Sequence, residues 1–196
     1  MRRLVAIALS FAVVVVAAGC GSSPSARFYT LSAAAAGAGA PSNISVTVGP
    51  VAIPAAVDRP QMVVTVGPNQ VRLEELNRWA SPLSNDIGRV VAENLATMLG
   101  TPRVAASGQT LSPDADYRVA IEVQRFDSAL GEAATLEAVW SVGRSSDGRS
   151  RTGRTSARET APDRTFDALA AAHSRAVARL SQDIADAVRA LDSSGR

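Results

Sequence analysis

The sequence predicts a single α+β domain in which a mainly antiparallel sheet is covered by two amphipathic helices. Several short segments alternate apolar and polar residues with the period of a strand, and two longer segments carry apolar residues at helical spacing. The length of 196 residues suits one domain with an N-terminal extension. A domain of this size buries roughly 70% of the surface of its unfolded chain, so it needs no disulfide or metal to fold.

The N-terminal residues 1–19 predict a lipoprotein signal peptide. Two arginines precede an apolar run over residues 4–18, which is shorter than the roughly twenty residues of a membrane-spanning helix. Small residues then directly precede Cys20, the only cysteine, as in the bacterial lipobox. We therefore expect Cys20 to be acylated, for example with palmitate, and to become the mature N-terminus. The alternative is an ordinary signal peptide cut near Ala18 that leaves a free cysteine.

Residues 20–26 then form the acylated cysteine and a short tether, and residues 27–196 form the domain. Each buried methylene contributes about 0.8 kcal/mol, and two chains already give stable anchoring. The expected location is the periplasmic face of the cell envelope. An Asp directly after the cysteine resembles an inner-membrane retention signal, and Gly21 in its place favours the outer membrane.

The first half of the domain predicts strands and one helix. Residues 27–31 (RFYTL) favour a strand, and the low-complexity residues 32–42 favour a loop. The predicted strands that follow are residues 44–53, interrupted at Gly49-Pro50, and the hairpin of residues 61–66 and 70–74.

The first helix is expected over residues 84–99, with Ser84 as a capping residue and Gly100 and Pro102 beyond its end. Its apolar stripe comprises Ile87, Val90, Val91, Leu95, Met98 and Leu99.

The second half predicts a sheet followed by a long helix. The expected strands are residues 103–105, 117–127, 133–144 and 150–160, with a turn at Asp147-Gly148. The last helix begins near Arg164 and continues to Leu191. Its buried stripe comprises Phe166, Leu169, His173, Ala176, Val177, Leu180, Ile184, Val188 and Leu191.

The sequence offers no catalytic constellation, so we predict no catalytic residues and no cofactor. The only histidine, His173, lies on the apolar stripe and is expected to be a packed structural residue. The acidic pairs Glu74-Glu75 and Asp114/Asp116 resemble ordinary surface acids. One Cys and one His cannot supply the four ligands of a structural zinc site, so no metal site is expected.

Two features are candidates for contact with a partner or with lipid headgroups. Residues 144–158 carry five arginines, namely Arg144, Arg149, Arg151, Arg154 and Arg158, with Asp147 as the only acid. Arginine binds phosphate bidentately, although a solvated hairpin is the simpler interpretation. Trp79 is the second candidate, with core packing as the alternative. No aromatic residues alternate with the arginines, so nucleic-acid binding is not expected.

Several phrases occur together in one known family. They are residues 27–31, 48–51, 53–54, 58–63 (DRPQMV), 78–83 (RWASPL), 94–95, 116–119 and 125–127. The sequence thereby resembles the ABC-type transport auxiliary lipoprotein family, over nearly the whole chain after Cys20.

The resemblance implies a non-enzymatic periplasmic lipoprotein that works beside an ABC permease, an ATPase and an MCE-domain protein. Such systems are implicated in moving phospholipids or other hydrophobic molecules between two membranes. The lipoprotein would dock on the MCE assembly, and an oligomeric ring is one arrangement for this. The alternatives from other classes are a lipid-anchored hydrolase, with His173 as its base, and a structural envelope-assembly lipoprotein.

The net charge of +2 belongs to the predicted signal peptide, because it derives from Arg2 and Arg3. From Cys20 onward the arginines and the acidic residues are equal in number at 18 each. A general basic field is therefore not expected to steer the mature chain to anionic lipid, and only a local arginine cluster could do so.

Overall fold

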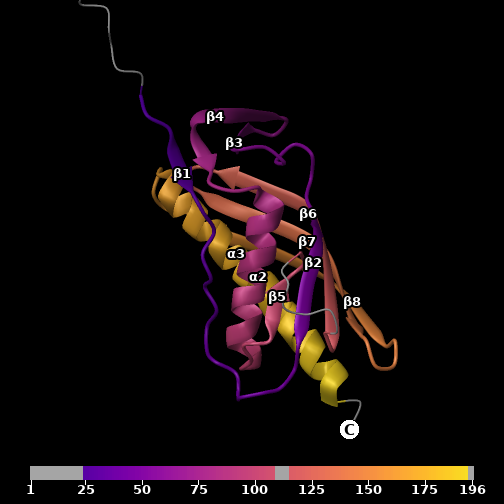
Figure 1. Cartoon of the computed structure of the whole chain (residues 1–196). Helices are drawn as coiled ribbons and strands as arrows, with labels where there is room; N and C mark the ends of the chain where they lie inside the picture. The colour runs from indigo at the N-terminus through magenta and orange to yellow at the C-terminus, as the bar shows by residue number, and fades with distance from the viewer. Residues whose placement is uncertain (1–23, 109–114, 194–196) are drawn as a thin grey trace, which may run out of the picture.

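The computed structural model describes residues 24–108 and 115–193 (Figure 1). In chain order the elements are β1 (Arg27–Tyr29), β2 (Val46–Ala52), β3 (Gln61–Gly67), β4 (Gln70–Trp79), α2 (Leu83–Leu99), β5 (Val104–Ala106), β6 (Tyr117–Ala129), β7 (Ala133–Arg144), β8 (Ser150–Thr160) and α3 (Phe166–Ser193). The expected α+β class is confirmed.

The strands are divided between two sheets, a feature that the sequence does not reveal. The larger sheet has the order β5-β2-β6-β7-β8, and the smaller sheet has the order β1-β4-β3. Strand β2 pairs in parallel with both β5 and β6, and β1 pairs in parallel with β4. The remaining three pairings, β3 with β4, β6 with β7 and β7 with β8, are antiparallel and contain most of the paired residues.

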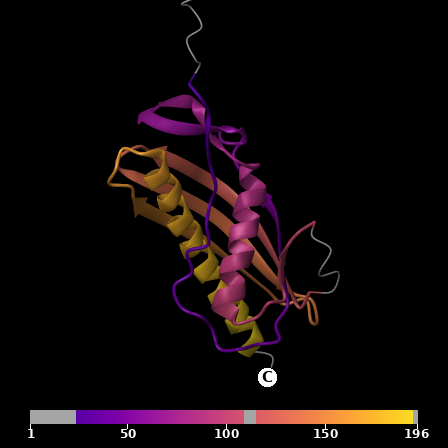
Figure 2. The same cartoon turned by 60° about the vertical axis from the view of Figure 1, so that its left-hand side comes forward.

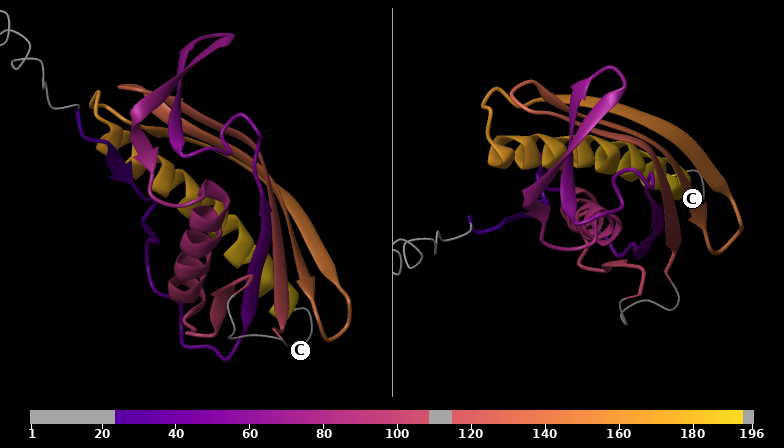
Figure 3. Two further views of the ribbon diagram at one scale, coloured as in Figure 1. Left: turned by 45° about the horizontal axis from the view of Figure 1, so that its top comes forward. Right: turned by 90° about the horizontal axis from the view of Figure 1, so that it is seen from above.

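Both helices cover the same face of the five-stranded sheet, and the small sheet lies at one end of the helix pair (Figure 3). The inward residues of β6 alternate with outward ones, and Val119 and Ile121 are buried beneath the helices. All six residues of the predicted stripe of α2 are buried, as are all those of α3 except the partly buried Phe166. The hydrophobic core therefore lies between the large sheet and the helices.

The two ends of α2 are set differently from each other. Its N-cap residue is Pro82, which makes no side-chain capping bond, so the prediction that Ser84 caps the helix was wrong. At the C-terminal end Gly100 adopts a left-handed conformation with φ of 64°, as a terminating glycine should. A Cβ atom at Gly100 would lie 2.2 Å from the carbonyl oxygen of Ala40, so a side chain has no room there.

The low-complexity residues 32–42 have no regular structure, as expected, but they run alongside the two helices (Figure 2). The backbone N–H of Ser32 donates to Ser174 Oγ of α3 at 3.1 Å. The backbone N–H of Ala34 donates to Asn94 Oδ1 of α2 at 3.0 Å. Polar side chains on the helices therefore satisfy the backbone of a segment that has no strand partner.

Element boundaries agree best in the second half of the chain, where β7 and β8 have the predicted ends. The largest difference is in β4, which continues to Trp79 rather than ending at Glu74. Residues 27–29 belong to the fold as β1, so only residues 21–26 separate it from Cys20, which lies outside the described residues. Within the described ranges, no helix is both long and apolar enough to cross a membrane.

Candidate functional site

Trp79 lies at the junction between the small sheet and the core. It is the last residue of β4, and its backbone N–H donates to the carbonyl oxygen of Pro60 at 2.7 Å. Its side chain is 5% exposed and makes edge contacts with Phe126 and His173, with ring centroids 6.2 and 6.1 Å away. The structure thus places Trp79 in the core, where it packs the end of β4 against β6 and α3.

His173 is fully buried, as its position on the stripe of α3 predicts. Its ring stacks on Phe126 with centroids 3.9 Å apart, and its Nε2 atom is 2.8 Å from Ser128 Oγ. Burial lowers the pKa of His173 to about 3, because a protonated ring at this position would have neither water nor a countercharge to stabilise it. The neutral ring and Ser128, also buried, form a pair that no substrate reaches in this conformation.

The arginines of residues 144–158 do not form one cluster. Arg149 lies beside the β7–β8 turn and Arg158 near the other end of β8, nine residues or about 30 Å apart. Figure 1 shows this turn at the end of the molecule that carries the C-terminus, away from β1. Arg151 lies on β8 close to the turn and is exposed.

Acidic side chains accompany most of these arginines. Asp147 bonds to Arg149 at 2.6 Å and lies 3.7 Å from Arg144, and a backbone hydrogen bond from Arg149 is the main cause of its lowered pKa. Glu137 of β7 accepts a hydrogen bond from Arg154 at 2.5 Å, and this bond lowers the pKa of Glu137. Glu137 of β7 therefore compensates positive charge that residues 144–158, with Asp147 as their only acid, leave uncompensated.

Asp116 belongs to a structural bond network at the start of β6. Its carboxylate accepts the backbone N–H of Ser45 at 2.8 Å and the hydroxyl of Ser45 at 2.6 Å. The hydroxyl bond is the largest cause of the lowered pKa of Asp116, and Arg103 and Arg144 lower it further. Asp114, its partner in the sequence pattern, lies outside the described residues, and Glu74 and Glu75 are surface residues that bond to nearby arginines.

Asp86, on the first turn of α2, holds the chain that follows β1. Its carboxylate accepts the backbone N–H of Leu31 at 2.7 Å and bonds to Arg89 at 2.5 Å. Arg89 in turn donates to the carbonyl oxygen of Leu31 at 2.7 Å. Because Asp86 is buried, these bonds fix the N-terminal segment to the helix pair.

The small sheet carries an exposed apolar surface that the sequence did not single out. Among the described residues, every large hydrophobic side chain classed as exposed lies on β1, β3 or β4: Phe28, Val66, Val71, Leu73 and Leu76. The alternation of apolar and charged residues in β4 marks a strand, but it does not reveal which side of that strand is covered. No group of three or more metal-ligating side chains occurs in the part of the chain that the structure describes.

Several solved structures are similar to this chain, including the following two. One is the crystal structure of an uncharacterised protein, with a TM-score of 0.69 and 21% identity, covering 84% of this chain and 99% of the other. The second is a protein from Xanthomonas campestris assigned to the family DUF330, with a TM-score of 0.66 and 22% identity, covering 87% of this chain and 100% of the other. At these identities the likeness establishes the fold. No curated protein matches by sequence.

Residues 29–185 match the family described as the ABC-type transport auxiliary lipoprotein component. The match extends from β1 almost to the end of α3 and so includes both sheets and both helices. This chain therefore belongs to the ABC-type transport auxiliary lipoprotein family.

Proposed function

We propose that this chain is the lipid-anchored auxiliary subunit of an MCE-type ABC transport system for phospholipids or other hydrophobic substrates, and that it acts by docking rather than by catalysis. The observation that carries the proposal is the family match over residues 29–185. A family described as an auxiliary transport component supports association with a permease and an ATPase. The MCE partner and the lipid cargo are inferred from the family resemblance.

The core geometry supports a role without catalysis. A hydrolase of the Ser-His type needs a base that a substrate can approach and that can take up a proton near neutral pH. His173 is the only histidine in the sequence, it is fully buried, and its pKa is about 3. Substituting His173 with Ala should therefore leave any hydrolysis measured for the purified protein unchanged.

The proposed anchor is acylated Cys20 in the outer membrane, on the periplasmic side. Its test is the mass of the N-terminal peptide of the protein purified from membranes, which should carry acyl chains on Cys20. The Cys20→Ser variant should fractionate away from membranes. An unmodified cysteine behind a cleaved signal peptide would contradict the anchor.

The docking proposal predicts that an MCE-domain protein is encoded beside this chain, and it is tested with that protein. Purified full-length chain is mixed with that protein, and the complex is measured by size exclusion with mass determination, which also reports whether the chain forms a ring. We expect a stable complex. Failure to bind would contradict the proposed function, and a Cys20→Ser protein that still binds would separate docking from anchoring.

A further inference from the structure

The small sheet carries the exposed large hydrophobic side chains among the described residues. The five exposed hydrophobic side chains on β1, β3 and β4 are between 39% and 64% exposed, with Phe28 and Val71 the most exposed. Their confinement to one three-stranded sheet is informative, because isolated exposed hydrophobic residues are normally scattered over a surface.

The strand register shows that several of them share a face. Side chains of directly paired residues lie on the same side of a sheet. Leu73 pairs with Val63 and Val71 pairs with Thr65, so these four residues lie on one side, where Val63 is only 9% exposed. The exposed Val66 lies on the other side of β3, with Met62 and Val64. Gln61 lies on that side too, since it is two residues before Val63 on β3.

The register of β3 and β4 shifts between Gln61 and Met62, and the pairing beyond this shift brings Phe28 to the side of Gln61. Arg78 pairs with Gln61 across β3 and β4, and Phe28 pairs with Arg78 across β1 and β4. Phe28, Val71 and Leu73 thus form a common outward face, which we call the apolar face. Its residues lie on β1 and β4.

The opposite face of the small sheet packs on the core along part of β3, while Arg72 and Val66 on that face remain exposed. Met62 and Val64 alternate with Val63 on β3 and are almost fully buried, and Met62 belongs to the main hydrophobic core. Trp79, at the end of β4, packs on Phe126 of β6. The side of the small sheet that packs on the core is therefore the side of Met62, Val64 and Trp79, and the apolar face points away from it.

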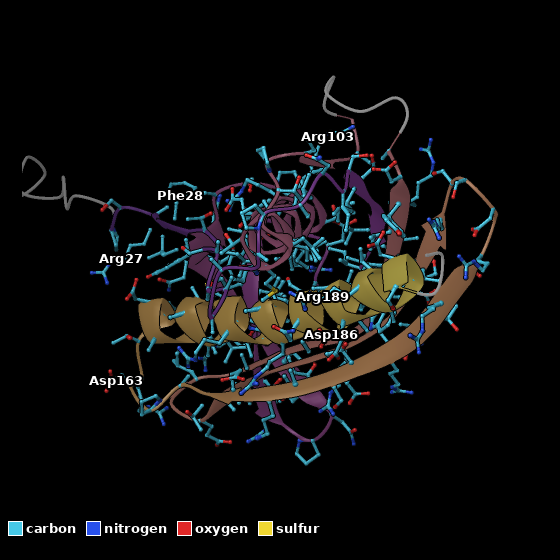
Figure 4. All side chains as sticks on the ribbon, turned by 90° about the horizontal axis from the view of Figure 1, so that it is seen from below. Arg27, Phe28, Arg103, Asp163, Asp186 and Arg189 are labelled. Carbon is cyan, nitrogen blue, oxygen red and sulfur yellow. The ribbon has the colours of Figure 1, made fainter. Side chains whose placement is uncertain are left out.

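The tether identifies what the apolar face can meet. Phe28 lies on the edge strand β1, just after the six tether residues 21–26, which reach at most about 20 Å. Figure 4 shows Phe28 and Arg27 on the side of the molecule where the N-terminal segment leaves it. Arg27 is adjacent to Phe28 in sequence, and Arg78 pairs with Phe28 across the sheet. Such a combination suits the lipid interface, where guanidinium groups meet phosphates and apolar side chains enter deeper.

We propose that the apolar face rests on the bilayer that holds acylated Cys20, with Phe28, Val71 and Leu73 in the interfacial layer. The inference rests on the proposed lipid anchor and adds an orientation to it. Three apolar side chains are too few for lasting attachment on their own, but they act as a second contact beside the acyl chains. The small sheet then lies on the membrane, and the β7–β8 turn, at the opposite end in Figure 1, points away from it.

The test uses spin labels on the full acylated protein in vesicles of phosphatidylethanolamine and phosphatidylglycerol. Acylation blocks Cys20, and the sequence has no other cysteine, so Val71→Cys introduces one labelling position. The matched control is Arg72→Cys, one residue away on the opposite side of the same strand and equally accessible to a label. A second control is Ser146→Cys in the β7–β8 turn, which is exposed.

We expect the label at position 71 to be protected several-fold from a water-soluble relaxation agent and to be reached readily by oxygen dissolved in the lipid. Labels at positions 72 and 146 should be as accessible to the water-soluble agent with vesicles as they are in buffer without vesicles or detergent. Phe28→Cys provides a second position on the same face if Val71→Cys does not fold.

Three outcomes would overturn the inference. In the first, an acylated protein floats with the vesicles, but its label at position 71 is as accessible to the water-soluble agent as the label at position 146. The apolar face then does not contact the bilayer, and the lipid anchor is retained. In the second, protection appears without lipid as the concentration rises, or only after the MCE-domain protein is added, and the occupant is then a second copy or a partner. In the third, an unmodified Cys20 removes the anchor and the inference together.

Discussion

The five-stranded sheet and the three-stranded sheet use their apolar residues in opposite ways. The large sheet has one face under two helices, and its inward residues on β6 and β7 are almost fully buried. The small sheet packs one face against the core and exposes Phe28, Val71 and Leu73 on the other. Only the large sheet has both helices over it (Figure 3). The difference indicates that the large sheet with its helices supplies stability, while the small sheet supplies a surface.

The most direct test of this difference is to make the same Leu→Ala substitution in both regions and compare the losses of stability. Leu180→Ala removes a fully buried side chain from α3 and should lower the free energy of unfolding by about 2–5 kcal/mol. Leu73→Ala on the small sheet should cost less than about 1 kcal/mol, since Leu73 is partly solvated already. Urea unfolding of the lipid-free Cys20→Ser protein measures both. Equal losses would contradict the division of roles.

The junction between the two regions predicts a pH dependence. Burial lowers the pKa of His173 from 6.5 to about 3, so the folded chain keeps the ring neutral where the unfolded chain takes up a proton. Stability is therefore complete above pH 6.5 and falls by about 1.4 kcal/mol per pH unit as the pH decreases toward 3. Between pH 6.5 and 5 the loss should be about 2 kcal/mol, and it should disappear in His173→Gln. An unchanged slope in that variant would assign the effect to other groups.

The link between the N-terminal segment and α2 should be weaker than the core but measurable. Asp86→Ala leaves the backbone N–H of Leu31 without its acceptor and should cost about 1–3 kcal/mol. Glu93→Ala is the matched control, because Glu93 binds the same Arg89 at 2.8 Å from an exposed position and should cost less than about 1 kcal/mol. Hydrogen exchange at the Leu31 amide should accelerate in the first variant alone. Equal exchange in both would refute a specific clamp.

The smallest effect is expected on the polar outer side of the large sheet. Arg154→Gln removes an exposed ion pair with Glu137 and should change the free energy of unfolding less than any of the substitutions above. The change should shrink further in 1 M salt, which screens exposed charges. Thermal unfolding at low and high salt checks this. A loss comparable with that of Leu180→Ala would mean that this surface supports the fold.

Hydrophobic periodicity was sufficient to predict elements that have one side exposed to solvent and one side buried in the core. The boundaries of β7 and β8 and the buried stripes of both helices follow from it directly. It was insufficient for the hairpin of β3 and β4, because Val71 and Leu73 alternate with Arg72 and Glu74 whichever side is covered. The pairing with β3, where Met62 and Val64 take the inner side, decides the outcome, and it cannot be read from β4 alone.

The candidate contact residues were limited by the same kind of information. A tryptophan before a helix is compatible with a core, the simpler interpretation, and with an interface. The ring neighbours of Trp79 that place it in the core are contributed by distant β6 and α3. The arginines were seen as one cluster because they are close in sequence. Extended chain separates them, and Glu137, which binds Arg154, comes from another strand.

The clamp of Asp86 on Leu31 also determines how the molecule would bear a mechanical load. Tension on the N-terminus reaches β1 first, and its three residue pairs with β4 run parallel to that strand. Behind them the load meets the carboxylate of Asp86 and the guanidinium of Arg89, which grip both sides of the Leu31 backbone. A pull on the N-terminus is thus transferred to the first turns of α2, and the residues that follow Leu31 are shielded from it.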